Sequence, residues 1–186
     1  MNDDFSRLAG QTELSAVDGQ IGRLTIRGYP IEELAAHASY EEAAYLLWYG
    51  ELPDAAALAD YAEELARYRP LHPLTVQVLE VCAAQRLAAI DALQVAAPTL
   101  GLDAPPEAAP PAITARLPSL VATYWRMLNG QSPVEARLDL GHTANYLYIL
   151  NGALPHPACV KALETYLVTM IDHGINASTF AARVIT

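Results

Sequence analysis

Residues 39–50 read Ser39-Tyr-Glu-Glu42-Ala-Ala-Tyr-Leu-Leu-Trp48-Tyr-Gly50, and this stretch carries both the start and the end of one helix. The S-x-x-E spacing lets the Ser39 hydroxyl accept a hydrogen bond from the Glu42 amide, while the Glu42 carboxylate bonds back to the Ser39 amide. Gly50 follows large apolar residues, and glycine can adopt the left-handed conformation that ends a helix. The stretch therefore predicts a helix over residues 40–49.

The apolar residues that follow recur with the period of a helix. One face is formed by Leu58, Tyr61, Ala62 and Leu65. Two prolines interrupt the chain soon after, so we expect this second helix to end near Tyr68. Shorter versions of the pattern cover residues 74–82 and 87–95, and two further apolar stripes end at Gly130 and Gly152. The chain is therefore predicted to be mostly helical.

Strand-like alternation is confined to residues 13–27. Two short segments there flank Asp18-Gly19, a dipeptide that tolerates the positive φ of a tight hairpin turn. We expect a small two-stranded ribbon and not a larger sheet. The predicted fold class is all-α, with a small N-terminal β-hairpin.

Two later segments decide how the helices are organised. The stretch Pro98–Pro111 is rich in proline, which lacks an amide donor and clashes with the preceding turn, so it predicts a surface loop. The stretch Pro157–His173 is apolar on almost all sides, so it predicts a central helix. We expect a single domain over residues 1–186. Its parts are a ribbon at 13–27, a first helical part at 31–97, a Pro- and Ala-rich loop at 98–115, and a second helical part at 116–186.

Composition excludes several classes of protein. The 186 residues are 53% apolar and 17% charged, which suffices for a folded core and excludes disorder as the main state. The 11 basic and 21 acidic side chains give a net charge of −10, so the cationic surface that nucleic acids or anionic lipids require is missing. The N-terminus is acidic where a signal peptide would be basic. We expect a cytoplasmic protein with no nucleic-acid or membrane partner.

Two cysteines, Cys82 and Cys159, lie in apolar helical patterns without the spacing of a metal or redox motif. We expect both to be reduced thiols in the core, and no metal site. The sequence also lacks a nucleophile elbow, a Gly-rich phosphate loop and an H-E-x-x-H motif. No catalytic residue is therefore assigned from motifs.

The stretch most informative about function is Asp172-His173-Gly174-Ile-Asn176-Ala-Ser178, which joins the predicted central helix to the next. Gly174 can end the first helix, and Asn176 or Ser178 can cap the second. The dipole of the first favours a protonated His173, and the free amides of the second favour an anion. This corner suits a carboxylate ligand. The alternative is a turn with internal hydrogen bonds only, and spacing alone favours that alternative.

The remaining histidines are weaker candidates for a ligand-binding residue. His142 lies on a predicted helix one turn after Asp139, which is a common surface pair. His37 lies near a helix end, and His72 and His156 precede prolines.

Four stretches, in order, resemble the N-terminal region of bacterial and archaeal citrate synthases, including the related 2-methylcitrate synthases. They are Val17-Asp-Gly-Gln-Ile-Gly22-Arg-Leu-Thr-Ile-Arg27-Gly-Tyr-Pro-Ile31-Glu-Glu-Leu34, Ala44-Tyr-Leu-Leu-Trp48-Tyr-Gly-Glu-Leu-Pro53, Leu138-Asp-Leu-Gly-His142-Thr-Ala-Asn145-Tyr-Leu-Tyr148-Ile-Leu-Asn-Gly152 and Asp172-His173-Gly-Ile-Asn176-Ala-Ser178-Thr-Phe180-Ala-Ala-Arg183. The resemblance implies an all-helical large domain, a homodimer packed through long helices, and the condensation of acetyl-CoA with oxaloacetate to citrate and CoA.

The resemblance also implies roles for single residues. His173 matches a histidine that hydrogen-bonds oxaloacetate, and Asn176 matches a neighbouring position with a shaping or capping role. The enolising histidine, the aspartate base, the carboxylate-binding arginines and the CoA-binding small domain follow later in the family and have no counterpart here. We therefore expect no catalytic residue, no bound cofactor and no binding residues for the co-substrate acetyl-CoA in this chain.

Three positions depart from the family pattern. Met170 stands where a second histidine is usual, and Ala88 and Ala89 stand where a His-Pro pair is usual. These changes remove no catalytic acid or base, but they alter the surroundings of the substrate pocket.

Two functions follow as expectations. The first is the N-terminal piece of a citrate synthase-type acyltransferase, inactive alone and dependent on a chain that supplies the missing half. The second is a non-catalytic interaction module that associates with itself or with a full-length paralogue through the dimer helices. The first explains better why the sequence ends within a helix just begun. In both cases we expect a homo-oligomer or a tight partner chain, and only weak binding of an oxaloacetate-like dicarboxylate.

Overall fold

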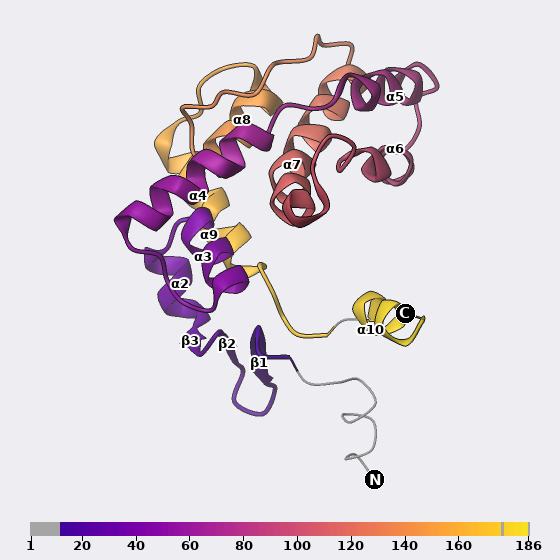
Figure 1. Cartoon of the computed structure of the whole chain (residues 1–186). Helices are drawn as coiled ribbons and strands as arrows, with labels where there is room; N and C mark the ends of the chain where they lie inside the picture. Colours follow the sequence, from indigo (N-terminus) through magenta and orange to yellow (C-terminus); the bar gives the residue numbers. More distant parts are fainter. Residues whose placement is uncertain (1–11, 176, 186) are drawn as a thin grey trace. The chain divides into compact units, whose positions relative to one another are not determined.

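A computed structural model describes residues 12–175 and 177–185, and the described chain is mostly helical (Figure 1). The predicted all-α class is confirmed. The helices are α2 (Ile31–His37), α3 (Tyr40–Tyr49), α4 (Ala55–Tyr68), α5 (Pro73–Ala84), α6 (Ala89–Ala96), α7 (Ala109–Leu128), α8 (His142–Asn151), α9 (Pro157–Thr169) and α10 (Ala177–Ile185), with short 3-10 turns at Ala97–Thr99 and Pro106–Ala108. None of these described helices is long and apolar enough to cross a membrane.

The β structure is larger than predicted. Strands β1 (Ser15–Asp18) and β2 (Arg23–Ile26) form the expected antiparallel ribbon, but β3 (Tyr29–Pro30) pairs with the other edge of β2 and makes a three-stranded sheet. The loop between β1 and β2 is also longer than a tight Asp-Gly turn. The Asp18 carboxylate accepts from the Gln20 amide at 3.0 Å, and the positive φ of +66° falls on Gly22.

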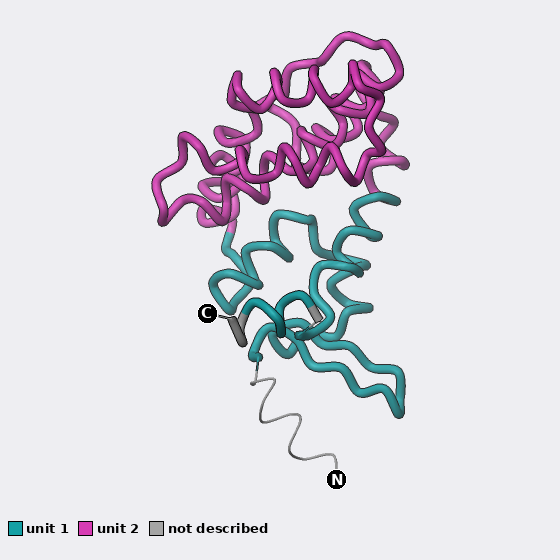
Figure 2. Tube along the Cα trace, turned by 90° about the vertical axis from the view of Figure 1, so that its right-hand side faces the viewer, with its two compact units in different colours: residues 1–54, 162–186 teal, residues 55–161 magenta. Residues whose placement is uncertain are grey.

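The chain divides into two compact units, shown in different colours in Figure 2. Unit 1 comprises residues 1–54 and 162–186, and unit 2 comprises residues 55–161. The boundaries fall before α4 and within α9. That the two units make up one domain stays a prediction.

Unit 1 has a compact apolar core between its sheet and its helices. Ile26 of β2 and Leu46 of α3 are fully buried in it, and so is Val168, which comes from α9 more than a hundred residues later in the chain. The predicted helix at 40–49 is confirmed with both of its ends. Ser39 and Glu42 form the capping box, and Gly50 adopts the left-handed conformation at the C-terminus.

Unit 2 is built around α7, which contacts α4, α5, α6 and α8. Leu79, Leu100 and Leu120 are fully buried in its apolar core. The central helix is therefore α7, and the prediction that residues 157–173 form a central helix is wrong. In α9, Val168 is buried, but Tyr166 is 60% exposed.

Two other predictions are also wrong. The Pro- and Ala-rich loop does not extend to residue 115, because α7 begins at Ala109 with Pro110 and Pro111 in its first turn, where the amide hydrogens have no helical partner to lose. Cys159 is exposed near the start of α9, so only Cys82 is the buried thiol that we expected.

Candidate functional site

The candidate site lies in the segment between α9 and α10. Helix α9 ends at Thr169, four residues earlier than predicted, and the Ile171 amide donates to the Val168 carbonyl at 3.2 Å in a tighter final turn. Ile171 then packs against the core of unit 1. His173 is therefore not the last residue of a helix, although Gly174 has the left-handed φ of +94° that was expected.

Asp172 organises this segment. Its Oδ2 atom accepts a hydrogen bond from the Ser15 hydroxyl, which comes from β1, and a second from the Gly174 amide at 3.1 Å. The bond to Gly174 spans two residues and makes His173 the central residue of a turn closed by a side chain. The Asp172 carboxylate thus connects β1, through Ser15, with Gly174, the residue that follows His173.

The two substrate-binding residues expected from the sequence have different outcomes. His173 is exposed, so a ligand can reach its imidazole, while Asn176 lies outside the described residues. Helix α10 begins at Ala177, and Ser178 on it is exposed. The positive end of the α10 dipole lies at this end of the helix. The anion site that the sequence predicts for this corner stays a prediction.

His142 is not the surface residue that we expected. It is 3% exposed at the start of α8, and burial, together with the charge of Arg69, lowers its pKa to about 3. Asp139 pairs instead with Arg137, with Nε and Oδ1 2.9 Å apart. His142 is therefore neutral at physiological pH and belongs to the interior of unit 2.

Two further histidines cap helices. The Nδ1 atom of His72 accepts from the Leu74 amide at 3.1 Å, and that of His156 accepts from the Ala158 amide at 3.2 Å. Each stands directly before a proline that opens a helix. The His-Pro pairs in the sequence carried this signal, because a helix that begins with proline needs an acceptor for the amide that follows it.

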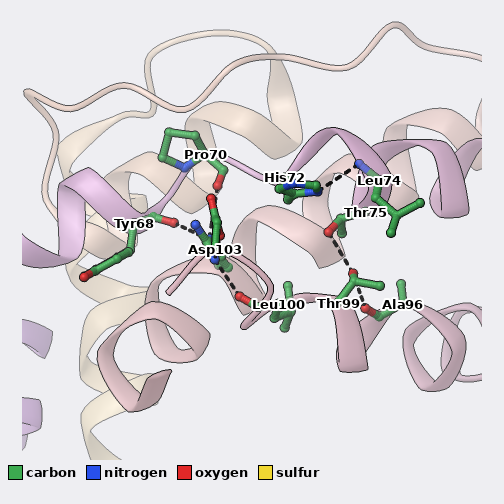
Figure 3. Close-up of polar contacts among 10 residues, drawn as sticks. Tyr68, Pro70, His72, Leu74, Thr75, Ala96, Thr99, Leu100 and Asp103 are labelled. Carbon is green, nitrogen blue, oxygen red and sulfur yellow. Dashed lines mark hydrogen bonds and ion pairs between the residues drawn. The ribbon is translucent and has the colours of Figure 1, made fainter. Parts of the chain in front are cut away.

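Unit 2 contains a buried arginine that the sequence analysis missed. The guanidinium of Arg116 donates to the carbonyls of Tyr68 at 3.0 Å, Pro70 at 3.3 Å and Leu100 at 2.7 Å. It also forms an ion pair of 2.6 Å with Asp103 (Figure 3). Partial burial would raise the pKa of Asp103, but the hydrogen bond and charge of Arg116 hold it below its usual range.

A second buried arginine, Arg69, borders a cavity of about 460 Å³ in unit 2. Its guanidinium donates to the carbonyls of Arg137 and Leu140 and so holds the segment before α8. The cavity walls are mostly apolar, with polar groups from Ser119, Thr123 and Glu135. Both arginines bond to the backbone, so their role in unit 2 is structural. Among the described residues, no cluster of His, Cys, Asp or Glu has the size to hold a metal ion.

Comparison with known proteins places this geometry in a family. A family model described as "Citrate synthase, C-terminal domain" matches residues 6–186. The chain belongs to the citrate synthase family. It is 38% identical to citrate synthase from Haloferax volcanii over 95% of this chain and 50% of that protein. It is 36% identical to 2-methylcitrate synthase from Mycobacterium tuberculosis (strain ATCC 25618 / H37Rv) over 94% of this chain and 46% of that protein.

Solved structures agree with this assignment. Citrate synthase from Pyrobaculum aerophilum matches with a TM-score of 0.85 and 36% identity, over 95% of this chain and 48% of that chain. Citrate synthase from Thermotoga maritima MSB8 matches with a TM-score of 0.81 and 31% identity, over 95% of this chain and 48% of that chain. The chain thus spans about half the length of the citrate synthases it matches.

Proposed function

We propose that this chain is the N-terminal portion of a citrate synthase-type acyltransferase, which condenses acetyl-CoA with oxaloacetate to give citrate. The observation that carries the proposal is the 38% identity to a citrate synthase over 95% of this chain. Relatives named citrate synthase and 2-methylcitrate synthase match almost equally well, so acetyl and propionyl groups are both candidates for the acyl group.

His173 is the residue that we propose contacts the substrate. Its side chain is exposed at the centre of a turn, and α10 begins four residues later. An imidazole N–H can donate to a carboxylate, and the positive end of a helix dipole favours an anion. Asn176, directly before α10, is proposed to shape or cap this corner. The substrate suited to the corner is a small dicarboxylate such as oxaloacetate.

The chemistry needs groups that this sequence does not supply. Enolising a thioester takes a base at the methyl group and an acid at the carbonyl oxygen, both within hydrogen-bonding distance. The chain spans about half of its relatives. We therefore propose that the acid, the base and the CoA-binding residues lie in the half of the family's length that this sequence does not cover.

The surface of α9 also favours association. Tyr166 is 60% exposed, and Met170, just after the helix, is 54% exposed. Large apolar side chains on one exposed segment are typical of a protein–protein interface. The same observation favours the second candidate function, a non-catalytic module that binds itself or a full-length paralogue. Activity in a reconstituted mixture separates the two.

The test measures thiol release from acetyl-CoA in the presence of oxaloacetate. We expect no turnover by this chain alone, and turnover when it is mixed with a chain that comprises the remaining half of a citrate synthase relative. His173→Ala should abolish the restored activity. The matched control is His37→Ala, which removes an exposed histidine from the last turn of α2. Turnover by the single chain that disappears in His173→Ala would overturn the dependence on a partner. A stable but inactive complex would favour the interaction module.

A binding experiment tests the corner without catalysis. One charge-assisted hydrogen bond contributes about 1.5–3 kcal/mol, so we expect at most millimolar affinity for oxaloacetate. An NMR titration that follows the His173 ring signals measures this. Ring signals that do not move in a demonstrably folded chain would contradict a preformed site.

A further inference from the structure

We propose that Ser15 and Asp172 are positioning residues that hold His173 in place for its ligand, an inference that rests on the function proposed above. Ser15 and Asp172 are 157 residues apart in the chain, and the Ser15 hydroxyl donates to the Asp172 carboxylate. The N-terminal sheet thereby controls a site that lies near the other end of the sequence.

Ser15 is a suitable anchor because its own position is fixed. It is 8% exposed and pairs in the antiparallel ladder with Ile26, which is fully buried in the core of unit 1. The ladder continues beyond the strand with a bond of 2.8 Å from the Arg27 amide to the Leu14 carbonyl. The hydroxyl of Ser15 is therefore presented by an element that packing and backbone hydrogen bonds hold rigid.

Asp172 connects the fixed position of Ser15 to the turn that contains His173. Its Oδ2 atom accepts from both the Ser15 hydroxyl and the Gly174 amide, so a single oxygen ties the sheet to the turn that contains His173. Gly174 has a φ of +94°, a conformation that a free chain samples as one of many. Without the carboxylate bond, the turn would lose the contact that selects this conformation.

None of the described residues 172–175 is fully buried. Val168 and Ile171 pack on the core of unit 1, but His173 is exposed. An exposed side chain on a loop binds a ligand well only if the loop is ordered beforehand, because ordering it during binding costs affinity. Ser15 and Asp172 supply that order and leave the imidazole itself accessible.

The experiment compares four variants of the full chain by NMR, with oxaloacetate and the stable analogue malate as probes. Ser15→Ala removes the donor, and Asp172→Asn removes the charge of the acceptor. Ser15→Thr keeps a hydroxyl at this position on a residue that suits a strand. Glu13→Gln is the matched control, because it removes one negative charge two residues before Ser15 from a side chain that is 94% exposed. It also removes an ion pair of 3.6 Å with Arg27, which contributes little to stability because the Glu13 side chain is exposed.

We expect dicarboxylate binding to weaken roughly three- to tenfold in Ser15→Ala, because a hydrogen bond to a charged group is lost. In Asp172→Asn the acceptor oxygen stays but its charge is lost, and with it a charge that repels a dicarboxylate, so the ligand-free measurements test this variant. Binding should recover in Ser15→Thr and stay unchanged in Glu13→Gln. Without ligand, the Gly174 amide should exchange with solvent faster in the first two variants, and the His173 ring signals should shift, while the core of unit 1 keeps its protection.

The outcomes separate this inference from the proposed function. If the wild-type chain binds dicarboxylates and Ser15→Ala binds them equally well, the positioning role is overturned and the role of His173 stands. If the wild-type chain does not bind them, the role of His173 fails, and the ligand-free measurements still decide the positioning role. Unchanged Gly174 exchange and unchanged His173 signals in both Ser15→Ala and Asp172→Asn would overturn it.

Discussion

The two compact units use their polar side chains in opposite ways. In unit 2, Arg69, Arg116 and His142 are buried, and both arginines donate to backbone carbonyls of neighbouring loops. In unit 1, the core is apolar, and His173 is exposed on a segment tied down by Asp172. A buried arginine that donates to backbone carbonyls joins neighbouring segments of the fold and so stabilises it. The buried groups of unit 2 thus contribute to its structure, while a ligand-binding role in unit 1 is proposed for His173.

The substitution expected to have the largest effect on stability, and so the strongest test of this comparison, is Arg116→Met. Methionine has a similar length but leaves the carbonyls of Tyr68, Pro70 and Leu100 without their donor. Each buried unsatisfied group costs about 1–3 kcal/mol, so the free energy of unfolding of unit 2 should fall by about 3 kcal/mol or more. Urea unfolding followed by circular dichroism measures the change, and hydrogen exchange assigns it to unit 2.

The matched control is Arg67→Met, because Arg67 is an exposed arginine in the last turn of α4. This substitution should change the free energy of unfolding by less than about 0.5 kcal/mol. If Arg116→Met is as mild as the control, the buried arginine does not stabilise unit 2, and the proposed contrast between the units is lost.

A smaller effect concerns pH and His142. A histidine in the unfolded chain takes up its proton near pH 6.5, whereas burial keeps His142 neutral until about pH 3. Between these values the unfolded state binds more protons, so the free energy of unfolding decreases as the pH falls. From pH 6.5 to pH 5, before most carboxylates titrate, this group should account for a loss of about 1–2 kcal/mol.

The measurement is urea unfolding at several pH values for the wild type, His142→Gln and His37→Gln. His142→Gln should flatten the pH dependence between pH 6.5 and 5, whatever its own effect on stability, and His37→Gln should leave the slope unchanged. An equally steep slope in His142→Gln would show that other groups cause the acid sensitivity.

Sequence reasoning predicted the helices whose ends carry their own signals. Ser39, Glu42 and Gly50 lie within one helix and its caps, so local chemistry sufficed to place that helix. The same reasoning failed where tertiary packing determines which helix faces are buried. Residues 157–173 are apolar on most sides, yet α9 is largely exposed, because periodicity shows that a face is apolar and not that a neighbour covers it.

The candidate site shows the same limit. The turn at His173 and the conformation of Gly174 follow from local residue types. The bond between Ser15 and Asp172 joins residues 157 positions apart, and no spacing rule connects them. Burial of His142 was also missed, because its distance from Asp139 in the sequence fits a surface pair equally well. Contacts between distant segments are set by the three-dimensional fold, and a single sequence does not display them.

The smallest effect belongs to unit 1 and tests its best-predicted element. In the capping box of α3, the Ser39 side chain accepts from the Glu42 amide at 3.2 Å, and the Ser39 amide donates to the Glu42 carboxylate at 2.7 Å. Glu164 of α9 adds a third acceptor, 3.4 Å from the Tyr40 amide.

We expect Ser39→Ala to lower the free energy of unfolding of unit 1 by about 1 kcal/mol, the usual cost of losing a serine cap. The loss should stay near this value because Glu164 and the Glu42 carboxylate still satisfy two amides of the first turn. Ser39→Thr keeps both the cap acceptor and the hydroxyl that donates to the Glu42 carboxylate at 2.7 Å, so it is the control and should be nearly neutral. Hydrogen exchange should show faster exchange at the start of α3 and unchanged exchange in α7. If α7 lost protection as well, the two units would be coupled in stability, and their polar residues could not be assigned separate roles.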